Sequence, residues 1–495
     1  MASTQISRIP RLQDHCMDAL YPLLEKYSAN SNSRAAGPLD NLAGDLTEML
    51  MERAYLTAPA WTTMWYLFLT PKIKRAYLPW DTKVWRIAKN KCRNLREVFV
   101  FTRNVKFKTM ILDLLPGMLT TLDLHGDLFY RGRPLPRGTH NNWLTEAEAW
   151  LRSMKVEKDI KPEMSGVGLS EIHLGDAQVS SEDLIVVLTH LPHIKLLRHY
   201  QMTRALCSMH GQTWRSSPSS APTYELTNID ADFSHVVRCR MEPTAVLPGD
   251  ALRLAVTLCP KATSVRLRVD SSTPHHVVAP LTALKNLHEL TAVCVTSGER
   301  PLLDFSDLAP ILEKFGPQSL RTLELKVLEE VDPHVIGKSC NKLERLTLSG
   351  CGFKTPSTCA QFRCKNQPLR LPALKLLFYA DGDDFSWDHS LPPCFWRSTM
   401  SSNVRMKSLL EGVFLESPRI PVEVLQDVFS PKAAFPFLSI FSVCRSSELT
   451  PDHLQDVSKS MSSLKYLRLS KCDNIGVRNG VKIKRMFPGV ELKIN

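Results

Sequence analysis

The stretch that decides the fold is Ile336–Cys351, with the sequence IGKSCNKLERLTLSGC. Its residues Leu343, Leu346 and Leu348 form the pattern L-x-x-L-x-L, whose second half alternates apolar and polar positions. Such alternation is typical of a short strand with one buried face. Because the pattern recurs along a chain of 495 residues, which is too long for one ordinary core, it predicts a stack of repeats.

Other copies of the pattern define the register of the repeats. Clear copies begin at Leu119, Leu169, Leu320, Leu343 and Leu464. Weaker copies begin at Leu95, Ala262, Leu287, Leu374, Leu410, Leu438 and Phe487. Six pairs of successive copies lie 23–28 residues apart, within the range of about 20–29 residues for leucine-rich repeats.

Two segments between the strands have the spacing of helices. Ser181–Leu191 and Pro451–Met461 carry apolar residues every three or four positions, and each follows a residue suited to start a helix. Parallel strands joined by such return helices form an α/β solenoid. We therefore predict a leucine-rich-repeat solenoid over residues 91–495, with at least nine strands between Leu95 and Ile494 in one curved sheet.

Cysteines flank several of the expected strands. In Ile336–Cys351 the pair Cys340-Asn341 precedes the strand and Cys351 follows it. This arrangement resembles the cysteine-containing repeat of F-box-type leucine-rich proteins. Val256–Val269 repeats its first half and Leu467–Asn474 its second. We interpret these cysteines as small buried side chains at turns.

Composition excludes several classes of function. Thirteen cysteines, an odd number, favour a reducing compartment, either cytosol or nucleus. A zinc site at Cys351, Cys359 and Cys364 is the alternative, but it lacks a paired C-x-x-C. No catalytic or nucleotide fingerprint is present, so we expect no enzyme, cofactor or metal. The longest apolar stretch, Ala58–Thr70, is shorter than the about 20 residues of a membrane helix.

Residues 1–90 do not fit the repeat, and we predict a small all-helical module there. Ser7–Lys26 has one apolar face, on which Leu12-x-x-x-Cys16-x-x-x-Leu20 lies. This motif resembles the elongin-binding BC box, and the resemblance implies that Leu12, Cys16 and Leu20 dock on elongin C. The alternative is an ordinary helix that caps the end of the solenoid.

A second apolar-periodic segment, Asn41–Leu56, follows the motif. The order of BC box, helical region and repeats resembles the Zyg-eleven and Zer-one type substrate receptors of cullin ubiquitin ligases, which implies elongin B and a cullin as further partners. The segment also resembles an F-box, with Leu42-Ala43 in place of the usual Leu-Pro. That second resemblance implies a Skp-type adaptor instead.

A basic segment follows the module. Pro71–Lys108 holds twelve Lys and Arg against two acids, a net charge of +10 within a chain of +12. Its aromatic residues Tyr77, Trp80 and Trp85 alternate with cations. We select Lys72, Lys74, Arg75, Lys83 and Arg86 as candidate partner-binding residues. Three alternatives stay open: a helix with a solvated basic face, contact with an acidic protein, and nucleic-acid binding by residues 72–108.

Four long gaps between copies predict inserted loops, at about 131–168, 207–224, 355–371 and 380–402. The last carries aromatics that either bind a partner or pack back on the array, and we select Phe385, Trp387 and Trp396 as candidates. Taken together, the patterns predict a non-catalytic substrate receptor of a ubiquitin ligase. The alternatives are a protein-binding scaffold unrelated to ubiquitin and a nucleic-acid-associated protein.

Overall fold

Two compact units make up the chain. Unit 1 is Met1–Ala205 with Tyr224–Leu226, and unit 2 is Leu206–Thr223 with Thr227–Asn495. The structure is a computed structural model. It describes residues 39, 42–57, 65–79, 87–88, 90–101, 121–125, 170–174, 179–217, 221–233, 247–270, 273, 276–295, 303–354, 371–381, 395–396, 409–416, 435–476 and 479–494.

Unit 1 contains a five-stranded parallel sheet in the order β1-β2-β3-β4-β5. Its strands are β1 (Arg75–Pro79), β2 (Glu97–Phe101), β3 (Thr121–His125), β4 (Glu171–His173) and β5 (Leu196–Arg198). Its other elements are α2 (Gly44–Thr57), η1 (Trp65–Phe68) and α7 (Ser181–His190). Helix α8 (Met202–Ser216) carries the chain from unit 1 into unit 2.

Unit 2 contains a ten-stranded sheet in which β6 to β15 follow one another in chain order, every pair parallel. The strands are β6 (Asn228–Asp232), β7 (Ser264–Val269), β8 (Glu289–Cys294), β9 (Thr322–Lys326), β10 (Arg345–Ser349), β11 (Leu376–Ala380), β12 (Gly412–Glu416), β13 (Ile440–Cys444), β14 (Tyr466–Ser470) and β15 (Glu491–Ile494). The return elements are α10 (Pro248–Leu258), η3 (Ala279–Ala283), α11 (Phe305–Phe315), α12 (Pro333–Ser339), α16 (Pro451–Ser460) and α17 (Gly480–Met486).

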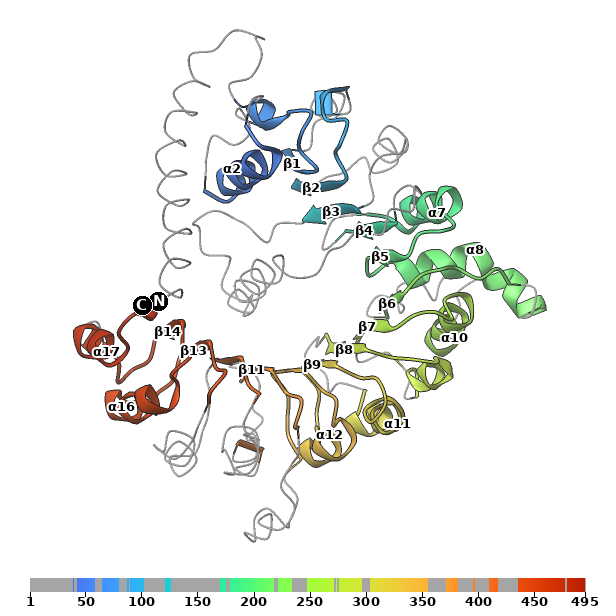
Figure 1. Ribbon diagram of the computed structural model, residues 1–495. Coiled ribbons are helices and arrows are strands. Elements are labelled where there is room, and N and C mark those ends of the chain that lie inside the picture. Colours follow the sequence, from blue (N-terminus) through green and yellow to red (C-terminus); the bar gives the residue numbers. More distant parts are fainter. Residues whose placement is uncertain are drawn as a thin grey trace. The chain divides into compact units, whose positions relative to one another are not determined.

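The strands of unit 2 follow an arc, with α10, α11, α12 and α16 on its outer side (Figure 1). Parallel strands joined by return elements are the arrangement of a leucine-rich-repeat solenoid, as the sequence predicts. Leu323, Leu346 and Leu467 point into the space between strands and helices and are 0% exposed. The repeat therefore buries its pattern leucines in one continuous core.

The flanking cysteines tie neighbouring repeats together. The Sγ of Cys351 donates to the carbonyl oxygen of Leu325 at 3.4 Å, and the Sγ of Cys472 donates to that of Val443 at 3.8 Å. Each accepting residue lies on the preceding strand. Burial raises the pKa of the Cys351 thiol to about 11 and that of Cys340 to about 12, so both stay protonated and unreactive at neutral pH.

The expectation of at least nine parallel strands in one sheet is confirmed by β6–β15, and β1–β5 form a separate sheet. The structure corrects two other expectations about organisation. Repeat strands begin at Arg75, within the module expected to be all-helical up to residue 90, because β1 pairs in register with β2. The insertion expected at 207–224 is helical as far as Ser216. None of the described helices is long and apolar enough to cross a membrane.

Candidate protein-binding surface

The face of the unit 2 sheet turned away from the helices, here the inner face, presents one unbroken row of side chains. Because the strands pair in parallel register, one residue of each strand lies beside one residue of the next strand. These ten residues are called the inner row. From β6 to β15 its members are Asp230, Arg266, Thr291, Glu324, Thr347, Phe378, Phe414, Ser442, Arg468 and Lys493. Arg266 and Lys493 are exposed, whereas Asp230, Thr347, Phe378, Phe414 and Ser442 are at most 4% exposed, so the row reaches solvent at only some of its strands.

Over β7–β9 the inner face carries two sets of charged side chains, one nearly buried and one exposed. The carboxylate of Glu324 is 13% exposed and lies 2.6 Å from the Nζ of Lys326. It also accepts a hydrogen bond from the Oγ1 of Thr291 at 3.2 Å. By contrast, Arg266 is exposed, and the side chain of Arg268 is 46% exposed above a nearly buried Asp232. Arg266 and Arg268 are thus more exposed than the acidic side chains of this face.

The shifted pKa of Glu324 shows how its nearly buried carboxylate is stabilised. Burial acts to raise the pKa of this carboxyl, but the charge and hydrogen bond of Lys326, with the charge of Arg266, outweigh burial and lower it. The carboxylate therefore stays ionised well into the acidic range. Its role is to fix neighbouring cations in place.

The inner row continues over β10–β12 as a stack of planar groups. The rings of Phe378 and Phe414 are 4.4 Å apart at 1° to each other, and the guanidinium of Arg345 lies 4.9 Å from the centre of Phe378. Gly412 makes room for this stack, because a Cβ there would lie 3.1 Å from the Phe414 ring. The stack is 0–3% exposed at its two phenylalanines and acts as a rigid support for Arg345.

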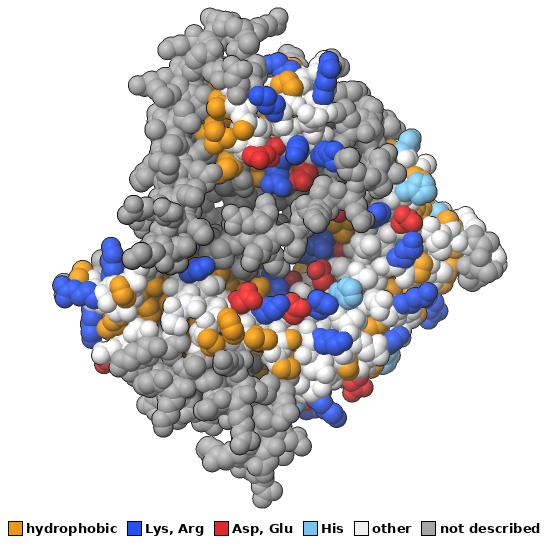
Figure 2. Space-filling view, in the orientation of Figure 1, with side chains coloured by type: hydrophobic (Ala, Val, Ile, Leu, Met, Phe, Trp, Pro, Cys, Tyr) orange, Lys and Arg blue, Asp and Glu red, His pale blue; other side chains and the backbone are white. Residues whose placement is uncertain are grey.

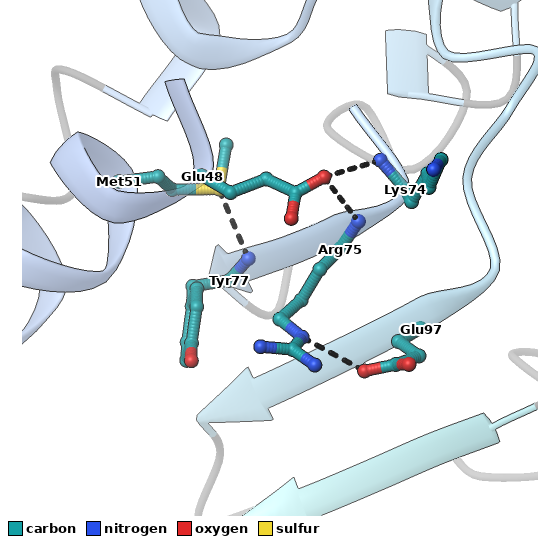
Figure 3. A network of polar contacts seen from close by, with 6 residues as sticks. All are labelled: Glu48, Met51, Lys74, Arg75, Tyr77 and Glu97. Carbon is teal, nitrogen blue, oxygen red and sulfur yellow. Dashed lines mark hydrogen bonds and ion pairs between the residues drawn. The ribbon is translucent and has the colours of Figure 1, made fainter. Parts of the chain in front are cut away.

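In unit 1, helix α2 covers the start of strand β1 (Figure 3). The Oε1 of Glu48 accepts hydrogen bonds from the backbone N–H of Lys74 at 2.6 Å and of Arg75 at 3.1 Å. The Sδ of Met51 accepts from the N–H of Tyr77 at 3.1 Å. These side chains satisfy amides on the side of β1 away from β2, so α2 caps the sheet.

We expect Glu48→Ala to destabilise unit 1 by about 1–3 kcal/mol, because two strand amides lose their acceptor. Glu48→Gln is the matched control, since its amide oxygen still accepts and should restore most of the stability. Hydrogen exchange at the Lys74 and Arg75 amides, together with urea denaturation, measures both effects. Unchanged exchange and stability in the alanine variant would show that Glu48 does not cap β1.

Most of the residues selected from the sequence lie outside the described residues. They are Leu12, Cys16, Leu20, Lys83, Arg86, Phe385 and Trp387. Cys359 and Cys364 of the alternative zinc site also lie outside them. The described residues contain no group of three or more His, Cys, Asp or Glu that could hold a metal ion.

The remaining selected residues have different surroundings. Lys72 and Lys74 are exposed, as expected of residues that bind a partner. Arg75 is instead engaged inside unit 1, where its Nε lies 2.8 Å from the Oε2 of Glu97. Trp396 is 1% exposed and packs edge-on against Tyr379, with ring centres 5.3 Å apart. Its selection as a binding residue is therefore wrong, because the indole belongs to the core.

Sequence reasoning missed the inner face itself. The residues concerned are Arg266, Arg268, Lys326, Arg345, Phe378 and Phe414. They occupy the x positions between pattern leucines, or the strand positions just before or after those leucines, and alternation alone assigns these to the face opposite the core. That signal was present in the repeat pattern. What the pattern lacked was the register that brings distant repeats side by side.

Comparisons with known proteins place the chain loosely. No family model matches it. A curated relative, the BTB/POZ domain-containing protein FBL11 of Arabidopsis thaliana, is 26% identical over an alignment of 229 residues that covers 41% of this chain. The chain spans 23% of that relative's length. A solved structure, the complex of Rad7 and Elc1 in yeast, matches with a TM-score of 0.47 and 12% identity, over 99% of this chain and 96% of that one.

Proposed function

We propose that the chain is a non-catalytic substrate-recognition subunit of a cullin-RING ubiquitin ligase, acting in the cytosol or nucleus. In this proposal the segment with Leu12, Cys16 and Leu20 docks on elongin C, which brings elongin B and a cullin. The repeat arrays hold a target protein. The ligase then acts by proximity, because the bound target's lysines stay at high local concentration near the charged partner enzyme.

The observation that carries the binding role is the inner row of unit 2. Its exposed part is the charged surface over β7–β9, which lies next to a buried aromatic stack over β10–β12. Repeat solenoids use such extended surfaces to bind other proteins. Arginine, which projects here from β7, is a residue type enriched at protein interfaces. This supports a macromolecular ligand rather than a small one.

The place of α2 favours one adaptor over another. Leu50 and Met51 are 0–1% exposed, and Met51 and Glu48 bond to the backbone around the start of β1. An F-box at Asn41–Leu56 would instead offer its apolar face to a Skp-type adaptor. Because Leu50 and Met51 pack inside unit 1 while Met49 is 39% exposed, α2 offers only part of that face, which weighs against the Skp-type adaptor.

The test is capture of purified elongin C–elongin B by the full chain. We expect binding by the unmutated protein and none by Leu12→Ala with Cys16→Phe, since the bulky ring no longer fits a pocket shaped for a small thiol. The melting temperature should change little. Leu247→Ala, at a leucine that is 65% exposed in unit 2, is the control and should bind normally.

Other outcomes separate the alternatives. Capture of a Skp-type adaptor instead would move the assignment to the F-box class. Failure to capture either adaptor, with normal melting, would leave a protein-binding scaffold unrelated to ubiquitin. Failure to capture together with a large fall in the double variant's melting temperature would make the first helix structural.

A further inference from the structure

Five exposed cations gather in two adjacent loops of unit 1. Lys72 and Lys74 lie just before β1, and Lys91, Arg93 and Arg96 lie just before β2. This set is called the basic edge. In Figure 2, Lys and Arg side chains gather over the upper part of the view, where α2, β1 and β2 are drawn in Figure 1.

Hydrogen bonds hold the two loops of the basic edge against each other. The carbonyl oxygen of Lys74 accepts from the N–H of Arg96 at 2.7 Å and from the N–H of Glu97 at 3.0 Å. The Nδ2 of Asn94 donates to the carbonyl oxygen of Pro71 at 3.0 Å. The cations of both loops are therefore fixed side by side by the sheet register.

Glu48 of α2 and Glu97 of β2 lie next to the basic edge, and both carboxylates already have partners. Among the described residues from 65 to 101, the one acid is Glu97, and its carboxylate is paired with Arg75. Glu48 of α2 accepts from backbone amides. The five cations outnumber these two carboxylates, and such an excess of positive charge favours an anionic partner.

The aromatic pair described on β1 and β2 bears on the choice between two kinds of anion. Single-stranded nucleic acids stack their bases on open aromatic faces. Here the Tyr77 ring stacks on Phe99, with centres 4.8 Å apart, and Tyr77 is 9% exposed. The Arg75 guanidinium lies 5.9 Å from the centre of Phe99. The aromatic pair on β1 and β2 thus serves the sheet and offers no platform for bases.

We propose that the basic edge of unit 1 is a docking site for an acidic, extended segment of a protein partner. Alternate side chains of an extended chain lie about 6.6 Å apart, and neighbouring strands about 4.8 Å apart. Successive carboxylates of such a segment can therefore pair with cations from the two loops. The proposal does not depend on the ligase assignment, because the edge lies apart from the elongin motif in sequence.

The experiment uses the full chain and a fluorescein-labelled peptide of twelve glutamates, followed by fluorescence anisotropy. The test variant is Lys74→Glu with Lys91→Glu and Arg93→Glu. The control reverses three exposed lysines of unit 2, Lys285→Glu, Lys338→Glu and Lys465→Glu, so that both proteins have the same net charge. A second test variant, Lys74→Gln with Lys91→Gln and Arg93→Gln, removes the cations without adding negative charges that could disturb folding.

We expect the glutamate variant to weaken peptide binding at least about tenfold at low salt, and the control less than about twofold, because steering is local within a Debye length. Equal losses in the two variants would show unspecific attraction to a basic protein and would overturn the proposal. So would tighter binding of a duplex or single-stranded DNA of equal charge that is lost in the same test variant. That result would assign the edge to nucleic acid.

Discussion

Leu346→Ala is expected to lower the free energy of unfolding of unit 2 by about 2–5 kcal/mol. The side chain is 0% exposed and lies in the row of core residues shared by β9, β10 and β11. Removing it leaves a cavity that the neighbouring leucines cannot close, because each is held in its own register. Urea denaturation followed by circular dichroism measures the loss.

The matched control for this prediction is Leu247→Ala. The same chemical change at a leucine that is 65% exposed should cost less than about 0.5 kcal/mol. If both variants lost similar stability, or neither lost any, the core of unit 2 would not be organised around the repeat leucines.

Gly316→Ala is expected to cost about 3 kcal/mol or more, although alanine is ordinarily the better helix former. A Cβ at this position, after the end of α11, would lie 2.5 Å from the carbonyl oxygens of both Leu312 and Ser339. Ser339 ends α12, so the clash is between two backbones that a side-chain rotation cannot relieve. The two helices would have to move apart.

Gly249→Ala is the control for that clash. Gly249 lies in the first turn of α10, and a Cβ there meets nothing within 4 Å. The substitution should therefore be neutral or stabilise the protein by up to about 1 kcal/mol. Thermal unfolding of both variants separates helix propensity from close packing. A Gly316→Ala variant as stable as the unmutated protein would contradict the contact between α11 and α12.

The repeat pattern predicted the strands that carry leucines at both core positions. Strands β9, β10 and β14 begin within two residues of Leu320, Leu343 and Leu464. Helix α7 could also be predicted, because Ser180 caps it through a capping box with Asp183. These features depend on neighbours in sequence, so a linear pattern contains them.

Other strands could not be predicted from local pattern. Strand β6 has the sequence NIDAD and places only Ile229 and Ala231 in the core, so it lacks the leucine signature. Strand β1 has cations and an aromatic residue at spacings that also fit a helix. Its extended form depends on pairing with β2, 22 residues away, and on Glu48 of α2. Such non-local partners do not show in the sequence.

The same limit applied to the binding surface. Alternation assigns Arg266 and Glu324 to the face opposite the core, but their closeness depends on two intervening strand pairings. The charge of Arg75 was visible in the sequence, whereas its pairing with Glu97 was not. A run of like charges therefore overstated how many cations are free to bind a partner, and it did not show that Tyr77 is already stacked.

The inner row also bears on how such a protein changes over generations. Neighbours along the row, such as Arg266 and Thr291 or Glu324 and Thr347, are 23–36 residues apart in the chain, and each lies between core residues of its own strand. In the proposed binding role, a point mutation at an exposed position such as Arg266 changes the contacts with the ligand while the buried leucines stay intact. Duplication of a whole repeat lengthens the row by one residue. Specificity then changes with little effect on stability at the exposed positions, whereas the buried Thr347, Phe378 and Phe414 cannot change without affecting the fold.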